Sequence, residues 1–216
     1  GPPGVDTDRF APLADDERSA AREHFGLEPE TPLVVSVSRL VPRKGMDVLI
    51  RAVARVADRL PDVTLAIAGH GRDRARLERV AQRHGAPTRF LGRVDDEQLP
   101  LLYGCADAFA MLCRNRWLGL EQEGFGIVFL EAAACGVPQV AGASGGSAEA
   151  VEHERTGFVI DPASDAVGAA AALKRILTDP ALARGLADAS RERAMADYSY
   201  DRLARDLEAG LAAWTP

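Results

Sequence analysis

The sequence predicts an α/β fold, a doubly wound Rossmann-like parallel sheet. Three observations predict it: apolar β-branched runs recur along the chain, segments with helical periodicity separate them, and the two patterns alternate about six times. The runs are apolar on both faces, as strands are when helices cover both sides of a parallel sheet. The hydrophobic fraction of 47% and the charged fraction of 27% fit an ordinary globular protein.

The chain of 216 residues begins with a segment rich in Gly and Pro, residues 1–13. We interpret this segment as the remnant of an interdomain linker rather than the start of a core. Because no initiator Met is present, we expect the sequence to begin inside a longer protein. A short helix is predicted over 14–25, and the apolar run PLVVSVS predicts a buried strand over 32–38.

The next segment has one apolar helical face, and Pro61 is expected to end it. The residues of that face are Leu49, Val53, Val56 and Leu60. VTLAIAG then predicts a strand over 63–69, and a helix is predicted over 72–85 with Gly85 as its stop signal.

The remaining pattern continues the alternation as far as residue 198, so we take 14–198 as one domain. Further strands are predicted at 88–92, 107–112, 138–142 and 157–160. Further helices are predicted at 95–104, 126–135, 145–153, 164–178 and 180–195. The tail 199–216 predicts a final helix that packs against something outside this domain.

Composition excludes several classes of protein. The net charge of −6 argues against a nucleic-acid partner, since such domains usually carry a basic face. Cys105, Cys113 and Cys135 form no C-x-x-C pair and are expected to be reduced, partly buried thiols. No apolar run is long enough for a membrane span, and the N-terminus has no signal-peptide pattern, so we expect a cytoplasmic protein.

In doubly wound sheets, ligands bind beyond the carboxyl ends of the strands, so the loops there matter most. The loop after the first strand carries Arg39, Arg43 and Lys44 and ends at Gly45, where a helix begins. Cations beside a helix N-terminus favour an anion such as a diphosphate. The alternative is a solvated basic loop. The glycine fingerprint of a dinucleotide-binding oxidoreductase is absent here, which argues against that class.

The loop after the second strand, GHGRDR, begins like a glycine fingerprint but has Arg74 at the third glycine position. It fits a tight turn at Gly69 that lets backbone approach a ligand, with His70 as a polar loop residue. The loop GASGGSAEAV at 142–151 either approaches a ligand by backbone or is a turn that needs positive φ.

The stretch 113–136 contains three carboxylates, Glu121, Glu123 and Glu131. Glu123 precedes Gly124-Phe125-Gly126, which opens a helix N-terminus, and Glu131 lies inside the apolar helix that follows. An ionisable group in such a helix needs a partner. Two carboxylates on either side of a phosphate-type helix start suit a sugar nucleotide, one for the ribose and one for the hexose. A buried ion pair between Glu131 and an arginine is the structural alternative.

The segments SRLVPRKGMDVLI, FLGRV and EGFGIVFLEAAACGVPQVAG, followed by SGGSAEAV, resemble the C-terminal, donor-binding domain of family-four retaining glycosyltransferases with the GT-B fold. Within that family the chain is most similar to GDP-mannose-dependent phosphatidylinositol (monomannoside) mannosyltransferases. The family's E-x7-E motif is met by Glu123 and Glu131. The resemblance runs from the linker to about residue 160 and implies an enzyme whose N-terminal acceptor domain this chain lacks.

The resemblance also implies a role for each matching residue. Arg39 and Lys44 would neutralise the donor diphosphate, which is the leaving group, and with Glu123 they form the expected catalytic set. Glu131 would hold the ribose hydroxyls and Glu123 the hexose. The expected nucleotide-sugar contacts are Arg39, Lys44, Gly69, Val94, Glu123, Phe125, Gly126, Ile127 and Glu131. Neither a metal nor a cofactor is expected, because the cations neutralise the leaving group.

The implied reaction is retaining hexosyl transfer, in particular mannosyl transfer, from GDP-mannose to a lipid-linked acceptor. The acceptor hydroxyl would attack from the face that the diphosphate leaves, without a carboxylate nucleophile. The isolated domain is expected to bind donor without catalysing transfer. The full-length protein is expected to lie at the inner membrane face through its N-terminal domain. A UDP-sugar donor, half of a sugar-nucleotide 2-epimerase and a noncatalytic sugar-nucleotide sensor stay open.

Overall fold

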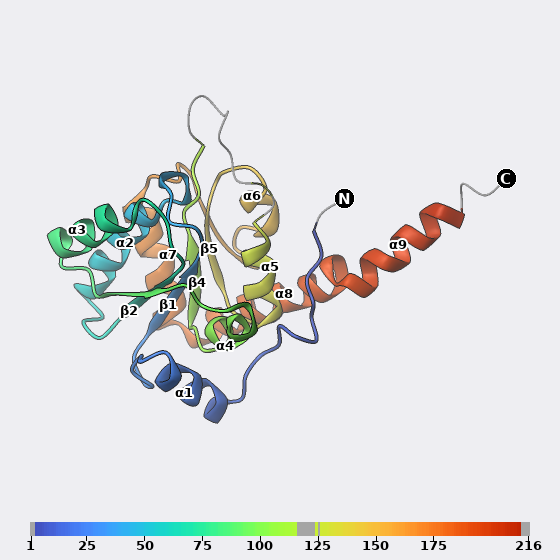
Figure 1. Cartoon of the computed structure of the whole chain (residues 1–216), viewed down its shortest axis with the longest axis horizontal. Coiled ribbons are helices and arrows are strands. Elements are labelled where there is room, and N and C mark those ends of the chain that lie inside the picture. Colours follow the sequence, from blue (N-terminus) through green and yellow to red (C-terminus); the bar gives the residue numbers. More distant parts are fainter. Residues whose placement is uncertain (1–2, 116–123, 125, 213–216) are drawn as a thin grey trace.

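The computed structural model describes residues 3–115, 124 and 126–212. Its centre is a six-stranded parallel sheet with the strand order β3-β2-β1-β4-β5-β6 (Figure 1). The strands are β1 Leu33–Val37, β2 Thr64–Ala68, β3 Thr88–Gly92, β4 Ala108–Met111, β5 Gln139–Gly142 and β6 Gly157–Ile160. Every strand coincides with a predicted apolar run, and the predicted doubly wound α/β fold is confirmed.

Helices cover both faces of the sheet (Figure 1). One set packs together as α2 Met46–Ala57, α3 Arg74–His84 and α7 Ala166–Thr178. The other set comprises α1 Asp15–His24, α4 Leu99–Gly104, α5 Ile127–Ala134 and α8 Pro180–Tyr198. Two 3-10 turns, η1 Pro42–Lys44 and η2 Asp96–Gln98, a single helical turn, α6 Ser147–Ala150, and a final helix, α9 Tyr200–Ala212, complete the described elements. No described helix is both long and apolar enough to cross a membrane.

The core lies between the sheet and its helices. Val35 pairs with Ala66 of β2 on one side and with Phe109 of β4 on the other, and all three are fully buried. The predicted face of α2 is buried at Leu49, Val53 and Val56. Burial of each large apolar side chain contributes about 1.5–3 kcal/mol, and this explains why runs apolar on both faces become central strands.

Three helix predictions need correction. The helix expected up to Pro61 ends at Ala57, since the backbone N–H groups of Arg59 and Leu60 both bond to Val56 in a closing turn. The helix expected at 145–153 is only the one-turn α6, because the chain is already extended at Val151. The stretch 95–104 divides into η2 and α4. Gly85 does end α3 in the left-handed conformation, with φ 61°, which confirms the predicted stop.

The segment before α1 belongs partly to the core, so the expectation that it lies outside the core is wrong. Val5 and Phe10 are 1% and 3% exposed, and Phe10 packs edge-on against Tyr103. Backbone hydrogen bonds join Val5 to Tyr198 and Tyr200, where α8 meets α9. The prolines and glycines of this segment predicted a linker and gave no sign that Val5 and Phe10 are buried. Its role as an interdomain linker stays a prediction.

The order of the strands creates a switch point between β1 and β4, the two central strands. The chain leaves β1 toward β2 in one direction and leaves β4 toward β5 in the other. In open parallel sheets such a point leaves a crevice at the carboxyl ends of the strands. In Figure 1 these ends form the upper edge, which also carries η1 and the starts of α5 and α6.

Candidate functional site

The carboxyl edge of the sheet brings together the loops after β1, β2 and β3. An open cavity of about 200 Å³ lies there. Its lining includes Arg39 after β1, Gly69 after β2, Val94 after β3 and Val128 in α5. Three of the sequence-predicted binding residues, from three different loops, therefore share one cavity.

The loops around this cavity interlock through their backbones. Gly69 has φ 130°, and a Cβ atom built on it would lie 1.8 Å from the carbonyl oxygen of Ser38. The N–H of Leu40 donates to the carbonyl oxygen of His70 over 2.8 Å. A glycine is therefore needed at position 69 because the loop after β1 packs directly against it. The sequence pattern did not reveal this reason. The same absence of a side chain opens backbone to the cavity.

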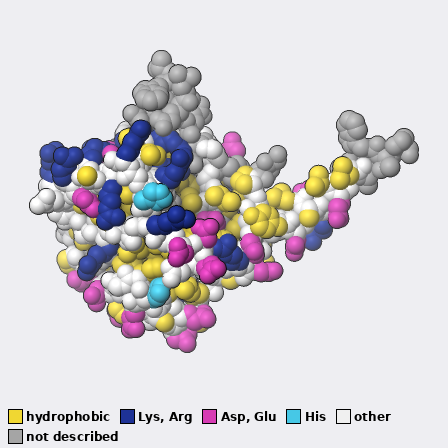
Figure 2. Space-filling view, viewed as in Figure 1, with side chains coloured by type: hydrophobic (Ala, Val, Ile, Leu, Met, Phe, Trp, Pro, Cys, Tyr) yellow, Lys and Arg dark blue, Asp and Glu magenta, His cyan; other side chains and the backbone are white. Residues whose placement is uncertain are grey.

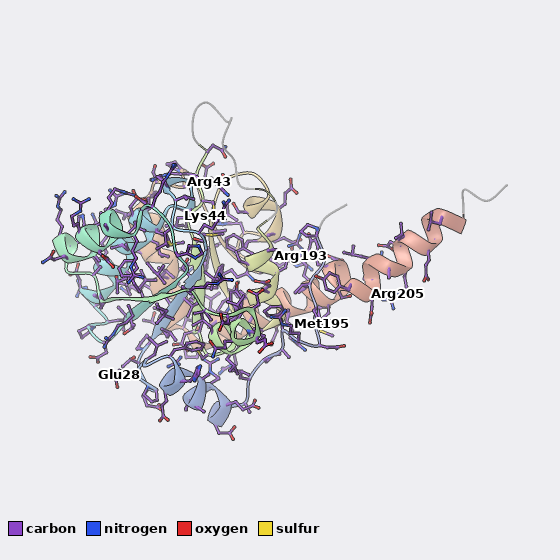
Figure 3. All side chains as sticks on the ribbon, viewed as in Figure 1. Glu28, Arg43, Lys44, Arg193, Met195 and Arg205 are labelled. Atoms are coloured by element: carbon purple, nitrogen blue, oxygen red, sulfur yellow. The ribbon has the colours of Figure 1, made fainter. Side chains whose placement is uncertain are left out.

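Lys44 lies at the same edge but does not line that cavity. It is the last residue of η1 and only 8% exposed. Figure 3 places Arg43 and Lys44 at the upper edge of the sheet. Gly45 follows with φ 67°, and a Cβ atom there would lie 1.8 Å from the carbonyl oxygen of Leu112. The predicted basic loop is thus a buried turn pressed against the end of β4, and the alternative of a solvated loop is wrong for Lys44. Arg39, by contrast, is exposed.

The N-terminus of α5 is the second predicted part of the anion site. Gly126 caps the helix in the left-handed conformation, with φ 71°, and Ile127 is 40% exposed. The first backbone N–H groups of a helix have no intrahelical partner and face outward. The glycine-rich loop after β5 lies nearby, because the N–H of Gly146 donates to the carbonyl oxygen of Gly124 over 2.8 Å. Glu123 and Phe125 lie outside the described residues.

Glu131 is partly buried on α5, where its carboxylate accepts a 2.7 Å hydrogen bond from the Tyr103 hydroxyl. Burial raises the pKa of Glu131, while the Tyr103 hydrogen bond and the charge of Arg9 lower that pKa in part. The charge of Asp96, a residue of the cavity wall, raises the pKa further. Glu131 therefore lies within electrostatic range of the cavity, one helical turn from Val128. Its hydrogen-bond partner among the described residues is a tyrosine rather than the arginine of the alternative interpretation.

Sequence reasoning missed several residues of this edge. Arg93 and Asp96 line the cavity. Arg114 and Asp47 lie behind the Lys44 loop and form an ion pair of 3.0 Å. These side chains meet across a separation of 67 residues, and no local pattern signals such a pair. The position of Arg114 soon after a buried strand was the only available hint.

A larger cavity, of about 670 Å³, opens at the opposite edge of the sheet. Arg22, which lines it, serves the fold. Arg22 is 5% exposed and donates to the carbonyl oxygens of Cys105, Pro29 and Thr31. Arg22 also pairs with Asp107. Because these guanidinium donors are already used and the strands begin here, the smaller cavity at the carboxyl edge is the better ligand site.

Charge is distributed unevenly over the face shown in Figure 2. Lys and Arg side chains gather at the upper left, around the carboxyl edge and α3, while acidic side chains dominate the lower part. A chain with a net charge of −6 thus presents positive charge near the candidate site. Such a local field attracts anionic ligands.

Comparisons with known proteins identify the family and the fold of this chain. The profile of the family described as "Glycosyl transferases group 1" matches residues 17–193. The GDP-mannose-dependent alpha-(1-6)-phosphatidylinositol monomannoside mannosyltransferase of Mycolicibacterium smegmatis is 49% identical over 181 residues, which cover 83% of this chain and 47% of that protein. The Mycobacterium tuberculosis H37Rv protein with the same description is 45% identical over 184 residues, 84% of this chain and 47% of that protein.

Solved structures show the same fold. HepE from Anabaena, in complex with UDP and glucose, has a TM-score of 0.84 and 25% identity, with 97% of this chain and 55% of that chain covered. Sucrose-phosphate synthase from Thermosynechococcus elongatus has a TM-score of 0.81 and 32% identity, with 99% and 52% covered.

These neighbours are GT-B glycosyltransferases, so the expected half of a GT-B fold is confirmed. The chain spans about half the length of the curated relatives it matches. From the match over residues 17–193, the chain belongs to the glycosyl transferases group 1 family.

Proposed function

We propose that this chain is the donor-binding domain of a retaining mannosyltransferase that uses GDP-mannose. The observation that supports the proposal most strongly is the placement of three elements at the carboxyl edge of the sheet, around its switch point. They are the cationic turn at Lys44, the N-terminus of α5 and the cavity lined by Arg39 and Val94. A diphosphate fits between cations and a helix N-terminus, and a nucleoside fits the cavity beside it.

Within this proposal each residue has a defined task. Lys44 and Arg39 compensate the negative charge that grows on the departing diphosphate. Backbone N–H groups of Gly126 and Ile127 add to that compensation, since oriented donors stabilise developing charge most effectively in a site that excludes water. Backbone at Gly69 and Val94 faces the nucleoside. Glu131 accepts hydrogen bonds from the ribose, and Glu123 and Phe125, outside the described residues, contact the hexose.

The reaction proposed for the full-length protein is front-face transfer. The acceptor hydroxyl attacks the anomeric carbon from the side that the diphosphate leaves, and the departing phosphate takes the proton. The proposed site needs no metal, because its cations stabilise the leaving group. The name of the M. smegmatis relative supports a phosphatidylinositol-based acceptor. We propose that a second domain of the same protein binds this lipid at the inner face of the membrane.

The final helix supports a role for a second domain. In Figure 1, α9 extends away from the body of the chain. Tyr200 and Leu207 are 56% and 64% exposed on this helix, and Leu203 shares their helical spacing. An apolar stripe of this kind is typical of a surface that packs against another domain. We propose that α9 contacts the acceptor domain.

Calorimetry of the 216-residue chain against GDP, UDP, ADP and NAD tests the donor class. We expect GDP to bind with a Kd between the micromolar and millimolar ranges, that is, about −4 to −8 kcal/mol, and to bind more tightly than the others. UDP bound more tightly than GDP would favour a UDP-sugar donor, for which the HepE complex is a precedent. NAD binding without GDP or UDP binding would contradict the proposal. A transfer assay with the chain alone should give no product.

A further inference from the structure

Arg114, three residues after the end of β4, touches the turn that carries Lys44 at two points. Its backbone N–H donates to the carbonyl oxygen of Arg43 over 2.9 Å. Its side-chain Nε donates to the carbonyl oxygen of Pro42 over 3.1 Å. Both acceptors lie in η1, directly before Lys44.

The same guanidinium also reaches the far side of the turn. Nη2 of Arg114 lies 3.0 Å from Oδ1 of Asp47, in the first turn of α2. The side chains of Arg114 and Asp47 are 25% and 14% exposed, so water weakens their attraction only in part. Arg114 therefore fixes positions 42, 43 and 47, which bracket Lys44 on both sides.

The turn has little internal support. Within it, the N–H of Lys44 bonds to Val41 over 3.0 Å and the N–H of Gly45 bonds to Pro42 over a long 3.4 Å. Three-residue 3-10 turns have poor hydrogen-bond geometry, so outside contacts decide their shape. Among the described residues, those contacts include the end of β4, where Leu112 packs against Gly45 and Arg114 binds Pro42 and Arg43.

Asp47 is shared with a second arginine, which provides a matched control. Arg76 of α3 lies 3.5 Å from Asp47 and is held by two 2.6 Å hydrogen bonds to Asp73. In the described part of the chain Arg76 makes no hydrogen bond to residues 42–45. Loss of Arg76 removes one ion pair of Asp47 but leaves the turn's own contacts intact.

We infer that Arg114 is a positioning residue that holds the Lys44 turn in place across the switch point between β1 and β4. The inference rests on the proposed function, in which Lys44 meets the donor diphosphate. Arg114 acts through this turn and does not touch the donor. Because the Lys44 turn follows β1 and Arg114 follows β4, this guanidinium aligns the cation across the switch point before the donor arrives. Preorganised charge of this kind needs no rearrangement on binding.

The first test uses the ligand-free chain and does not depend on any nucleotide. Amide hydrogen exchange is measured for peptides covering 41–46 in wild type, Arg114→Gln, Arg114→Lys and Arg76→Gln. We expect exchange at Lys44 and Gly45 to quicken about tenfold in Arg114→Gln, since a charge-assisted hydrogen bond is lost. Arg76→Gln should match wild type. Arg114→Lys should fall between them, because lysine lacks the fork that reaches Pro42 and Asp47 together.

The second test compares GDP with GMP by calorimetry in the same four proteins. A displaced turn should weaken GDP binding about tenfold and GMP binding much less, since GMP lacks the β-phosphate. General damage to the fold would weaken both nucleotides equally and would overturn the inference, as would unchanged exchange and unchanged GDP binding in Arg114→Gln. If wild type itself fails to bind GDP while exchange still quickens in Arg114→Gln, the proposed function fails and the structural role of Arg114 stands.

Discussion

The hydroxyl of Tyr103 donates a 2.7 Å hydrogen bond to Oε2 of Glu131 and so joins α4 to α5 beside the candidate site. Both groups pack into the interior, and burial raises the pKa of each. A carboxylate that is held by one donor on a buried helix keeps its second oxygen for another partner. In the proposed function that partner is the ribose.

Glu131 should make stability depend on pH. The pKa of its carboxyl group is raised above the ordinary value of 4.5, with burial as the first cause. The folded protein therefore holds this proton more tightly than the unfolded chain. Its contribution to stability is fully present below pH 4.5 and is lost as pH rises through the folded pKa. Urea unfolding of wild type and Glu131→Gln at several pH values should show wild type losing stability relative to the variant across that window. A constant difference would contradict the assignment.

Gly45 and Gly85 form a matched pair of left-handed glycines, with φ 67° and 61°. A Cβ atom at Gly85 meets nothing within 4 Å, so Gly85→Ala should cost only the backbone penalty of about 1–2 kcal/mol. At Gly45 the same atom clashes with Leu112, so Gly45→Ala should cost about 1–3 kcal/mol more. Chemical denaturation measures both. Equal losses would show that the Lys44 turn is not pressed against β4.

The three cysteines are free and buried, as expected from the sequence. Burial raises the pKa of Cys105 to about 11 and of Cys135 to about 12, so both remain protonated thiols at neutral pH. Because the thiolate is the nucleophile, native protein at pH 8 should resist iodoacetamide at both positions, and protein in urea should react at all three cysteines. Mass spectrometry of the labelled protein checks this. Rapid native labelling of Cys135 would contradict its buried position.

Lys44 and Lys174 are the only lysines of the chain, which offers a clean control. Lys44→Ala removes the cation proposed to meet the diphosphate and should weaken GDP binding by about 1.5–3 kcal/mol. Lys174 is exposed on α7 and should be replaceable by Ala without effect on binding. Calorimetry on both variants gives the comparison. A similar loss of GDP affinity in both variants would contradict the proposed contact between Lys44 and the diphosphate.

The strands could be predicted because short runs of apolar residues show which segments are buried. Runs such as LVVSV and TLAIA are apolar on both faces and fit only the centre of a covered sheet. The order of the strands then predicts which edge of the sheet carries the candidate site. The ends of helices were harder to predict. A longer helix was expected at 145–153, but α6 has only one turn, Ser147–Ala150, because the chain becomes extended at Val151.

The residues that line the candidate site could be predicted only where they lie in short local motifs. Arg39, Gly69 and Val94 were named from short segments and do share a cavity. Arg114 and Asp47 were missed because their pairing depends on β1 and β4 lying side by side in the sheet. The buried position of Phe10 was missed because its partner, Tyr103, lies far along the chain. Tertiary contacts of this kind leave no periodic signal in a sequence.

The central claim is that a nucleoside diphosphate binds at the carboxyl edge of the sheet, between β1 and β4. Backbone amide NMR of the chain titrated with GDP tests it most directly. We expect the largest shifts at Lys44, Gly69, Val94 and Ile127, with saturation at one common Kd. Shifts centred instead on the opposite edge, around Arg18 and Arg184, would contradict the claim.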